Sequence, residues 1–161
     1  MRQKLKINSP QDAKEYAFLL LKFRLRSERE LESRLKRKKF SPEVIRQTTE
    51  FLKEKKFIDD TLFARGWIQS RLRRSLGARR IAQELKLKGI DKDIIKKQLG
   101  ILKTDYSEAE VIRQLAEERF KKLKDTEPRS AMRRVYSFLV RRGFSPDKVT
   151  DVLQSLCRQT S

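Results

Sequence analysis

One pattern of apolar residues occurs three times along the chain, and it constrains the fold more than any other feature. Each copy has two apolar residues four apart, then an apolar residue directly before a Ser or Asp, then an apolar residue four positions later. The Ser or Asp positions are Ser41, Asp91 and Ser145. Apolar spacing of three or four residues is typical of amphipathic helices, and only five glycines and four prolines interrupt it. The repeat therefore predicts an all-α fold.

The same three copies carry matching signals for helix ends. Ser41 and Ser145 each precede a proline, which is the usual order of an N-cap and a first helical residue. Lys39, Gly89 and Gly143 occupy the equivalent position before the cap, where a helix commonly ends in left-handed backbone. Ser27 is predicted to cap the second helix, which contains the first two apolar residues of the first copy. The inward faces of the first and third helices are predicted to hold Ala13, Tyr16, Ala17, Leu20 and Phe23, and Val44, Ile45, Thr48, Phe51 and Leu52.

These signals predict three tandem three-helix repeats. We place them at 1–57 (with a short basic N-terminal arm), 58–104 and 105–161. Each core is small for a unit that folds alone, and we expect the repeats to stack into an elongated, curved helical array. A single nine-helix globule is the alternative. Three copies with identical offsets favour the repeats.

Composition excludes several classes of function. The chain has no histidine and one cysteine, which excludes Ser-His and Cys-His nucleophiles and His-containing zinc sites. Cys157 alone forms no intrachain disulfide, so a reducing compartment is expected. The longest apolar stretch, residues 16–21, is far shorter than the roughly 20 residues of a membrane span, and no export signal is visible at the N-terminus. We therefore expect a cytoplasmic, basic, folded protein with few means of catalysis.

Positive charge is built into all three repeats. The chain has 41 Lys and Arg against 22 Asp and Glu, a net charge of +19, and the excess is 9, 7 and 3 in the three repeats. It is densest between residues 61 and 90 and again between 34 and 39. Such density favours an anionic or phosphate-rich partner over ordinary solvated helix faces. The predicted partner or DNA contacts are Arg65, Arg73, Arg74, Arg79, Arg80, Lys86 and Lys88, with Arg34, Lys36 and Lys38.

Arg71 falls on the apolar side of its predicted helix, near Trp67. A charge in that place needs a partner, and Asp59 and Asp60 are the plausible ones, although Asp59 could equally be the N-cap of the helix. Trp67 is expected in the core rather than as a platform for stacking bases. A nuclease using Asp59 and Asp60 to hold Mg²⁺ is disfavoured, because neighbouring carboxylates on a helix point in different directions.

The middle repeat resembles the signature of the RecX family. The resemblance lies in Phe57-Ile58-Asp59-Asp60-Thr61-Leu62-Phe63-Ala64, followed by Trp67, Arg71, Gly77, Ile81, Glu84-Leu85 and Lys88-Gly89-Ile90. Weaker similarity in the outer repeats extends it over nearly the whole chain. Lys39 departs from it mildly, since a turn residue such as glycine would suit that position better. The signature residues expected to determine the fold are Phe57, Asp59, Asp60, Phe63, Trp67, Arg71, Gly77, Ile81, Leu85 and Gly89.

The resemblance implies a three-repeat, nine-helix protein that regulates the bacterial recombinase RecA. Members of the family bind RecA and RecA–DNA filaments, block filament extension, and lower RecA's ATPase, strand-exchange and coprotease activities, which act in homologous recombination and the SOS response. It implies no enzymatic activity and no cofactor. We expect a monomer that binds DNA weakly through its basic surface. A stand-alone basic helical DNA-binding protein is the alternative function.

Overall fold

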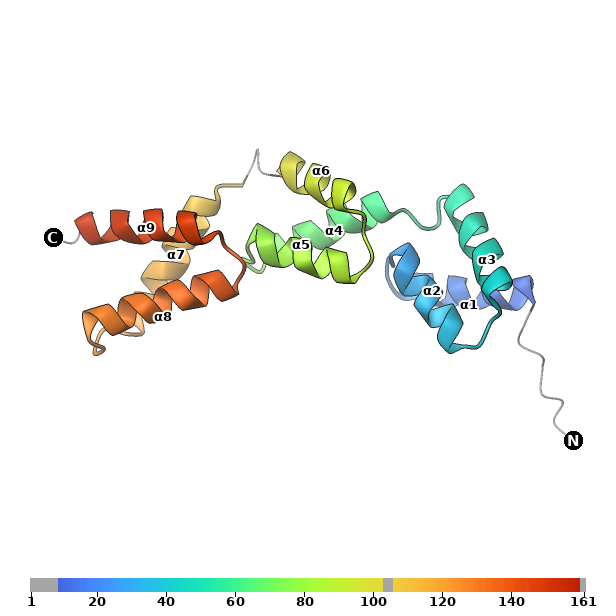
Figure 1. Ribbon diagram of the computed structural model, residues 1–161, viewed down its shortest axis with the longest axis horizontal. Helices are drawn as coiled ribbons and strands as arrows, with labels where there is room; N and C mark the ends of the chain where they lie inside the picture. Colours follow the sequence, from blue (N-terminus) through green and yellow to red (C-terminus); the bar gives the residue numbers. More distant parts are fainter. Residues whose placement is uncertain (1–8, 103–105, 160–161) are drawn as a thin grey trace, which may run out of the picture. The chain divides into compact units, whose positions relative to one another are not determined.

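The computed structural model describes residues 9–102 and 106–159, and within them it contains nine α-helices and no strand (Figure 1). The all-α prediction and the three three-helix repeats are confirmed. The helices are α1 Pro10–Phe23, α2 Glu28–Arg37, α3 Pro42–Glu54, α4 Asp60–Leu72, α5 Ala78–Leu87, α6 Lys92–Leu102, α7 Glu108–Lys121, α8 Pro128–Arg141 and α9 Pro146–Gln159. No helix in the described ranges is both long and apolar enough to cross a membrane.

The helix ends follow the signals in the sequence. Ser27 and Ser41 cap α2 and α3, because each hydroxyl accepts a hydrogen bond from a backbone N–H in the first turn. Lys39, Gly89 and Gly143 have φ angles of 64°, 81° and 93°. All three are in the left-handed region, where an L side chain is strained and glycine is not. The second helix of the first repeat therefore ends in the same left-handed backbone as in the other repeats, although its residue there is Lys39 and not glycine.

The chain divides into two compact units, and the division passes through the middle repeat. One unit contains Met1–Gly66 with Leu85–Ile95, and the other contains Trp67–Glu84 with Lys96–Ser161. Helices α4, α5 and α6 thus contribute one part to each unit. The exact repeat boundaries at residues 57 and 104 remain predictions.

Helices α1, α2 and α3 enclose the core of the first unit. Phe23, expected in this core, is 77% exposed, because α1 ends there and the backbone turns away in extended form at Arg24. Phe57, a signature residue, is also half-exposed, and the edge of its ring meets Phe18 with 4.8 Å between ring centroids. The buried residues of this core are Ala13, Ala17, Leu31, Leu35, Phe40, Val44, Leu52 and Ile58.

Helices α7, α8 and α9 enclose the core of the second unit, and the loop before α5 docks on the end of α8. The N–H of Gly77 donates to the carbonyl of Arg142 at 2.9 Å, and the N–H of Arg79 donates to the carbonyl of Gly143 at 3.1 Å. A Cβ atom at Gly77 would overlap the backbone of Gly143. The core itself consists of Ile112, Ala116, Val135, Leu139, Phe144, Val149, Val152 and Leu153.

Candidate functional site

An arginine-lined cavity of about 190 Å³ lies in the first unit, and we call it the arginine cavity. Its wall comes from three segments: the loop after α1, one face of α2, and the end of α5. Residues four positions apart on a helix lie on one face, which explains why Arg29, Ser33 and Arg37 all line the cavity. The lining residues are Arg24, Arg26, Arg29, Glu30, Ser33, Arg34, Arg37, Leu87 and Lys88.

The wall of this cavity contains one carboxylate, Glu30, and two cations hold it. Arg24 approaches Glu30 at 2.9 Å and Lys88 approaches it at 2.6 Å. Burial acts to raise the pKa of Glu30, but the hydrogen bonds from Arg24 and Lys88 outweigh it and hold the pKa at about 2. Glu30 is therefore ionised at neutral pH, and its negative charge is already matched by two positive ones.

Arg26 is the buried cation of the arginine cavity, with 9% of its surface exposed. Its Nε donates to the carbonyl of Leu20 at 3.3 Å, which fixes the guanidinium against the end of α1. Burial lowers the pKa of Arg26, and repulsion from Arg24 and Arg34 lowers it further. Arginine nevertheless stays protonated at neutral pH. The fold thus holds a positive charge in a place where other positive charges oppose it.

Two contacts join the end of α5 to α2 and complete the wall. The Ser27 hydroxyl donates to the carbonyl of Lys88 at 2.7 Å, so the cap of α2 also fixes the backbone that carries Lys88. Gly89 follows, and a Cβ atom there would collide with the side chain of Arg29. The bare backbone of Gly89 therefore leaves Arg29 the room to reach the arginine cavity.

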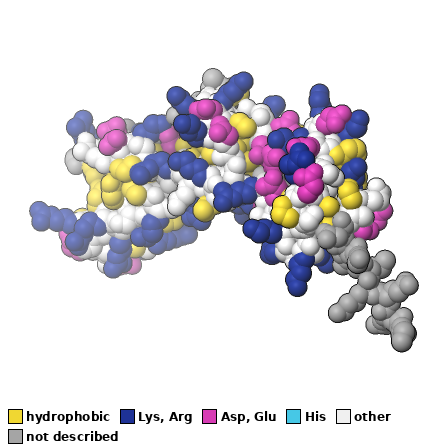
Figure 2. All heavy atoms as spheres, turned by 45° about the vertical axis from the view of Figure 1, so that its right-hand side comes forward, with side chains coloured by type: hydrophobic (Ala, Val, Ile, Leu, Met, Phe, Trp, Pro, Cys, Tyr) yellow, Lys and Arg dark blue, Asp and Glu magenta, His cyan; other side chains and the backbone are white. Residues whose placement is uncertain are grey.

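The predicted contact residues are distributed over both units. In the first unit Arg34 and Lys88 line the arginine cavity, whereas the others are exposed outside it. Two of the predicted contacts already have a carboxylate partner: Lys88 pairs with Glu30, and Arg80 pairs with Glu84. Figure 2 shows Lys and Arg side chains spread over the face in view. The exposed residues are Lys36, Lys38, Arg65 and Lys86 in the first unit, and Arg73, Arg74, Arg79 and Arg80 in the second.

Four arginines of the arginine cavity were missed by the sequence analysis: Arg24, Arg26, Arg29 and Arg37. Counting charge per window favoured the denser segments after residue 34 and around residue 80. The available signal was the run of arginines at short spacing on both sides of the Ser27 cap. Only the packing of α2 against residues 85–95 turns that run into a concave site.

Arg71 pairs with Glu84, and not with either aspartate proposed from the sequence. Its Nε lies 2.5 Å from Oε2 of Glu84, and its guanidinium lies over the Trp67 ring at 3.9 Å from the centroid. Trp67 Nε1 donates to the same carboxylate oxygen at 3.0 Å. Burial acts to raise the pKa of Glu84, but the hydrogen bonds from Arg71 and Trp67 lower it. This arrangement joins α4 to α5, so these residues have a structural role in the second unit.

The two aspartates bind backbone N–H groups. Asp59 caps α4, accepting hydrogen bonds from the N–H groups of Thr61 and Leu62 at 2.7 and 3.0 Å. Asp60 accepts a hydrogen bond from the N–H of Glu28 at 2.9 Å and so caps α2 from another helix. Among the described residues, no three carboxylate or cysteine side chains are grouped to hold a metal ion.

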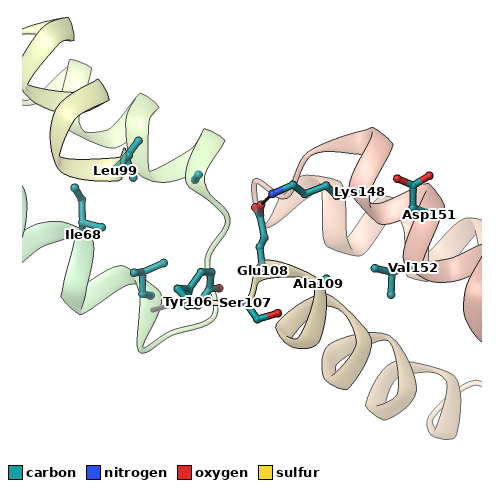
Figure 3. Close-up of a pocket in the computed structure, with 11 residues that line it drawn as sticks. Ile68, Leu99, Tyr106, Ser107, Glu108, Ala109, Lys148, Asp151 and Val152 are labelled. Carbon is teal, nitrogen blue, oxygen red and sulfur yellow. Dashed lines mark hydrogen bonds and ion pairs between the residues drawn. The ribbon is translucent and has the colours of Figure 1, made fainter. Parts of the chain in front are cut away.

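A second cavity, of about 370 Å³, lies in the second unit and is mainly apolar (Figure 3). At its rim Glu108 of α7 meets Lys148 of α9 at 2.5 Å. The Tyr106 hydroxyl is buried and has no hydrogen-bond partner among the described residues. Burial, followed by the charge of Glu108, raises the pKa of Tyr106, so this hydroxyl stays neutral. The cavity offers little to an anionic partner.

Comparison with known families assigns all three repeats. Residues 13–52, 59–99 and 106–153 match the family models for the first, second and third three-helix domains of RecX. The chain belongs to the RecX family. Each matched range lies inside one of the three predicted repeats, and the second includes most of the signature residues.

Individual RecX relatives agree with this assignment. A protein named "Regulatory protein RecX" from Clostridium botulinum (strain Alaska E43 / Type E3) is 30% identical over 159 residues, covering 94% of this chain and 74% of the relative. The protein of the same name from Amycolatopsis mediterranei (strain U-32) is 30% identical over 148 residues, covering 91% and 84%. The one from Caldanaerobacter subterraneus subsp. tengcongensis is 34% identical over 108 residues, which span 55% of that relative.

Solved RecX structures share the fold. The crystal structure of RecX from Lactobacillus salivarius aligns with a TM-score of 0.82 and 25% identity, covering 91% of this chain and 96% of that one. A second structure, described as regulatory protein RecX, aligns with a TM-score of 0.80 and 22% identity. It covers 90% of this chain and 73% of its own, and at that identity it supports the fold alone.

Proposed function

We propose that this chain binds the recombinase RecA and RecA–DNA filaments in the bacterial cytoplasm and blocks filament extension. The result is inhibition of RecA's ATPase, strand-exchange and coprotease activities, without catalysis or a cofactor of its own. Membership of a family of regulatory proteins carries the proposal. We further propose that the protein acts as a monomer.

The charge of the molecule supports such a partner. A filament on DNA presents phosphates as well as protein, and cationic side chains that neutralise phosphates release counterions and add affinity. The first unit supplies the arginine cavity, and the second supplies exposed arginines at the end of α4 and the start of α5. Positive charge on both units gives the chain two places at which to contact an anionic filament.

The decisive experiment measures RecA's DNA-dependent ATPase while the protein is added. Blocking extension acts at filament ends, so we expect inhibition at amounts well below one protein per RecA. Unchanged ATPase with the cognate RecA at low salt would contradict the proposal. A stand-alone DNA-binding protein instead predicts tight binding to DNA without RecA and no substoichiometric inhibition. Anisotropy titration of labelled DNA alone separates the two.

A double charge reversal tests whether the surface of the second unit contacts the filament. Arg73→Glu with Arg79→Glu reverses two exposed charges for which the described residues show no ion pair, and we expect weaker filament inhibition with unchanged melting. Arg80 is unsuitable for this test, because its side chain pairs with Glu84 at 3.4 Å. Equal inhibition by this variant and the unmodified chain would place the contact elsewhere.

A further inference from the structure

We propose that the arginine cavity holds one backbone phosphate of a nucleic-acid strand at a fixed position on the first unit. The inference rests on the proposed binding to RecA–DNA filaments and specifies where the DNA component is held. It differs from diffuse attraction to a basic surface, which needs charge but no particular geometry.

The charge balance of the arginine cavity requires an anion. Six cationic side chains line it, and the lone carboxylate of the wall, Glu30, already pairs with Arg24 and Lys88. The four arginines that remain are Arg26, Arg29, Arg34 and Arg37. Among the described residues, no carboxylate lies within ion-pair distance of any of these four. Like charges facing one cavity repel one another. The fold itself gains nothing from gathering them, whereas a bound anion would pair with them.

Arg26 makes the site specific. Arg26 as a whole residue is 9% exposed, lines the arginine cavity, and has one side-chain hydrogen bond among the described residues, from Nε to Leu20. A buried charge is costly unless it is paired and hydrogen-bonded. The remaining N–H groups of this fork lack a protein partner among the described residues, although they are not fully buried. A phosphate oxygen in the arginine cavity supplies a partner, and the bond to Leu20 has already fixed the orientation of the fork.

The residue types favour a phosphodiester. Arginine presents a planar fork of donors that matches phosphate oxygens with two bonds at once, whereas lysine acts as a point charge. The unpaired cations of the arginine cavity are all arginines, and Ser33 adds a hydroxyl. Arg29 and Arg37, one on each side of Ser33 along α2, are more exposed than Arg26. A nucleic-acid strand carries phosphates in succession, so neighbouring phosphates can meet these outer arginines.

A charge-conserving substitution separates a built site from diffuse attraction. In Arg29→Lys with Arg34→Lys the net charge is unchanged but the forks are lost. We expect affinity for a fluorescein-labelled oligothymidine, measured by anisotropy with the full chain and no RecA, to fall about tenfold. Arg134→Lys with Arg141→Lys, two exposed arginines of α8 that lie outside the arginine cavity and the predicted contacts, is the matched control and should change affinity by less than about twofold. Equal affinities for both variants and the unmodified chain would overturn the proposal.

Two further measurements identify the occupant and exclude misfolding. At constant ionic strength, inorganic phosphate should raise the melting temperature of the unmodified chain more than that of the cavity variant, because a ligand stabilises the state that binds it. Equal shifts would overturn the proposal. An oligoglutamate of matched charge should displace the labelled strand less effectively than unlabelled oligothymidine. Displacement as effective as that of DNA would assign the arginine cavity to an acidic protein segment instead.

Measuring RecA's ATPase in the presence of the same proteins distinguishes failure of the phosphate site from failure of the proposed function. If the unmodified chain inhibits RecA while the cavity variant binds DNA undiminished, the phosphate site is wrong and the proposed function stands. If the unmodified chain fails to inhibit RecA but the cavity variant loses DNA affinity, the phosphate site stands and the proposed function is wrong.

Discussion

Replacing Arg71 with alanine tests whether the contact between α4 and α5 stabilises the second unit. The side chains of Arg71 and Glu84 are 17% and 23% exposed, and their ion pair measures 2.5 Å. A hydrogen bond to a charged group contributes about 1.5–3 kcal/mol, and a cation over an aromatic ring adds about 0.5–1 kcal/mol. Glu84 keeps its bonds to Trp67 and Arg80, so it is not left unpaired. We therefore expect the free energy of unfolding to fall by about 2–4 kcal/mol.

The assay is urea unfolding followed by fluorescence, since Trp67 is the chain's one tryptophan and lies in the cluster. Arg80→Ala is the matched control, because Arg80 pairs with the same carboxylate at 3.4 Å but is half-exposed. Exposed pairs contribute little, so the control should lose less than about 0.5 kcal/mol. A double-mutant cycle with Glu84→Gln should give a coupling of about 1–2 kcal/mol. Equal losses for Arg71→Ala and Arg80→Ala would show that the Arg71 pair stabilises the second unit no more than an exposed pair does.

Three further predictions concern the fold. The pKa of Glu30 is lowered from 4.5 to about 2, so its contribution to stability is complete above about pH 4.5 and is lost as pH falls towards 2; acid titration of Glu30→Gln should lack this loss. Burial raises the pKa of Asp60, so Asp60→Asn, which keeps an acceptor for the N–H of Glu28, should be neutral or slightly stabilising, whereas Asp60→Ala should cost about 1–3 kcal/mol in thermal melts. Gly77→Ala should lower the free energy of unfolding by more than about 2 kcal/mol, because the added methyl overlaps the backbone of Gly143. An unchanged melting temperature would show that the loop before α5 adjusts without cost.

Local signals made the helices and their ends predictable. The Ser27 and Ser41 caps and the left-handed residues at Lys39, Gly89 and Gly143 depend on neighbours a few positions away in the chain, so the sequence contains all that determines them. Because the pattern occurs three times, each signal is supported by the equivalent positions of the other two copies. The prediction that Phe23 lies in the core was wrong, because it was based on the helical wheel and took no account of the end of α1 at this residue.

Contacts between helices were less predictable. Arg71 was expected beside Asp59 or Asp60, at the start of its own helix, but its partner Glu84 lies thirteen residues on, in α5. Sequence reasoning correctly required a partner for a charge on an apolar face. It had no means of choosing among carboxylates on other helices, because that choice depends on how α4 and α5 pack.

The arginine cavity shows the same limit at the candidate site. Charge density located Arg34 and Lys88 but treated them as members of two separate clusters. Tertiary packing places both on one wall and pairs Lys88 with Glu30. It also adds the buried Arg26, whose environment no count of charges reveals. Composition thus predicted an anionic partner, whereas the geometry of a binding site required the fold.

Whether this RecX-family chain limits RecA filament growth can be measured by watching single filaments extend on DNA. Labelled RecA is allowed to grow from nucleated segments, and the protein is then added at well below one copy per RecA. We predict that extension stops while filament already formed remains long enough to be measured. Extension at an unchanged rate, with the protein present at the same ratio and low salt, would contradict it.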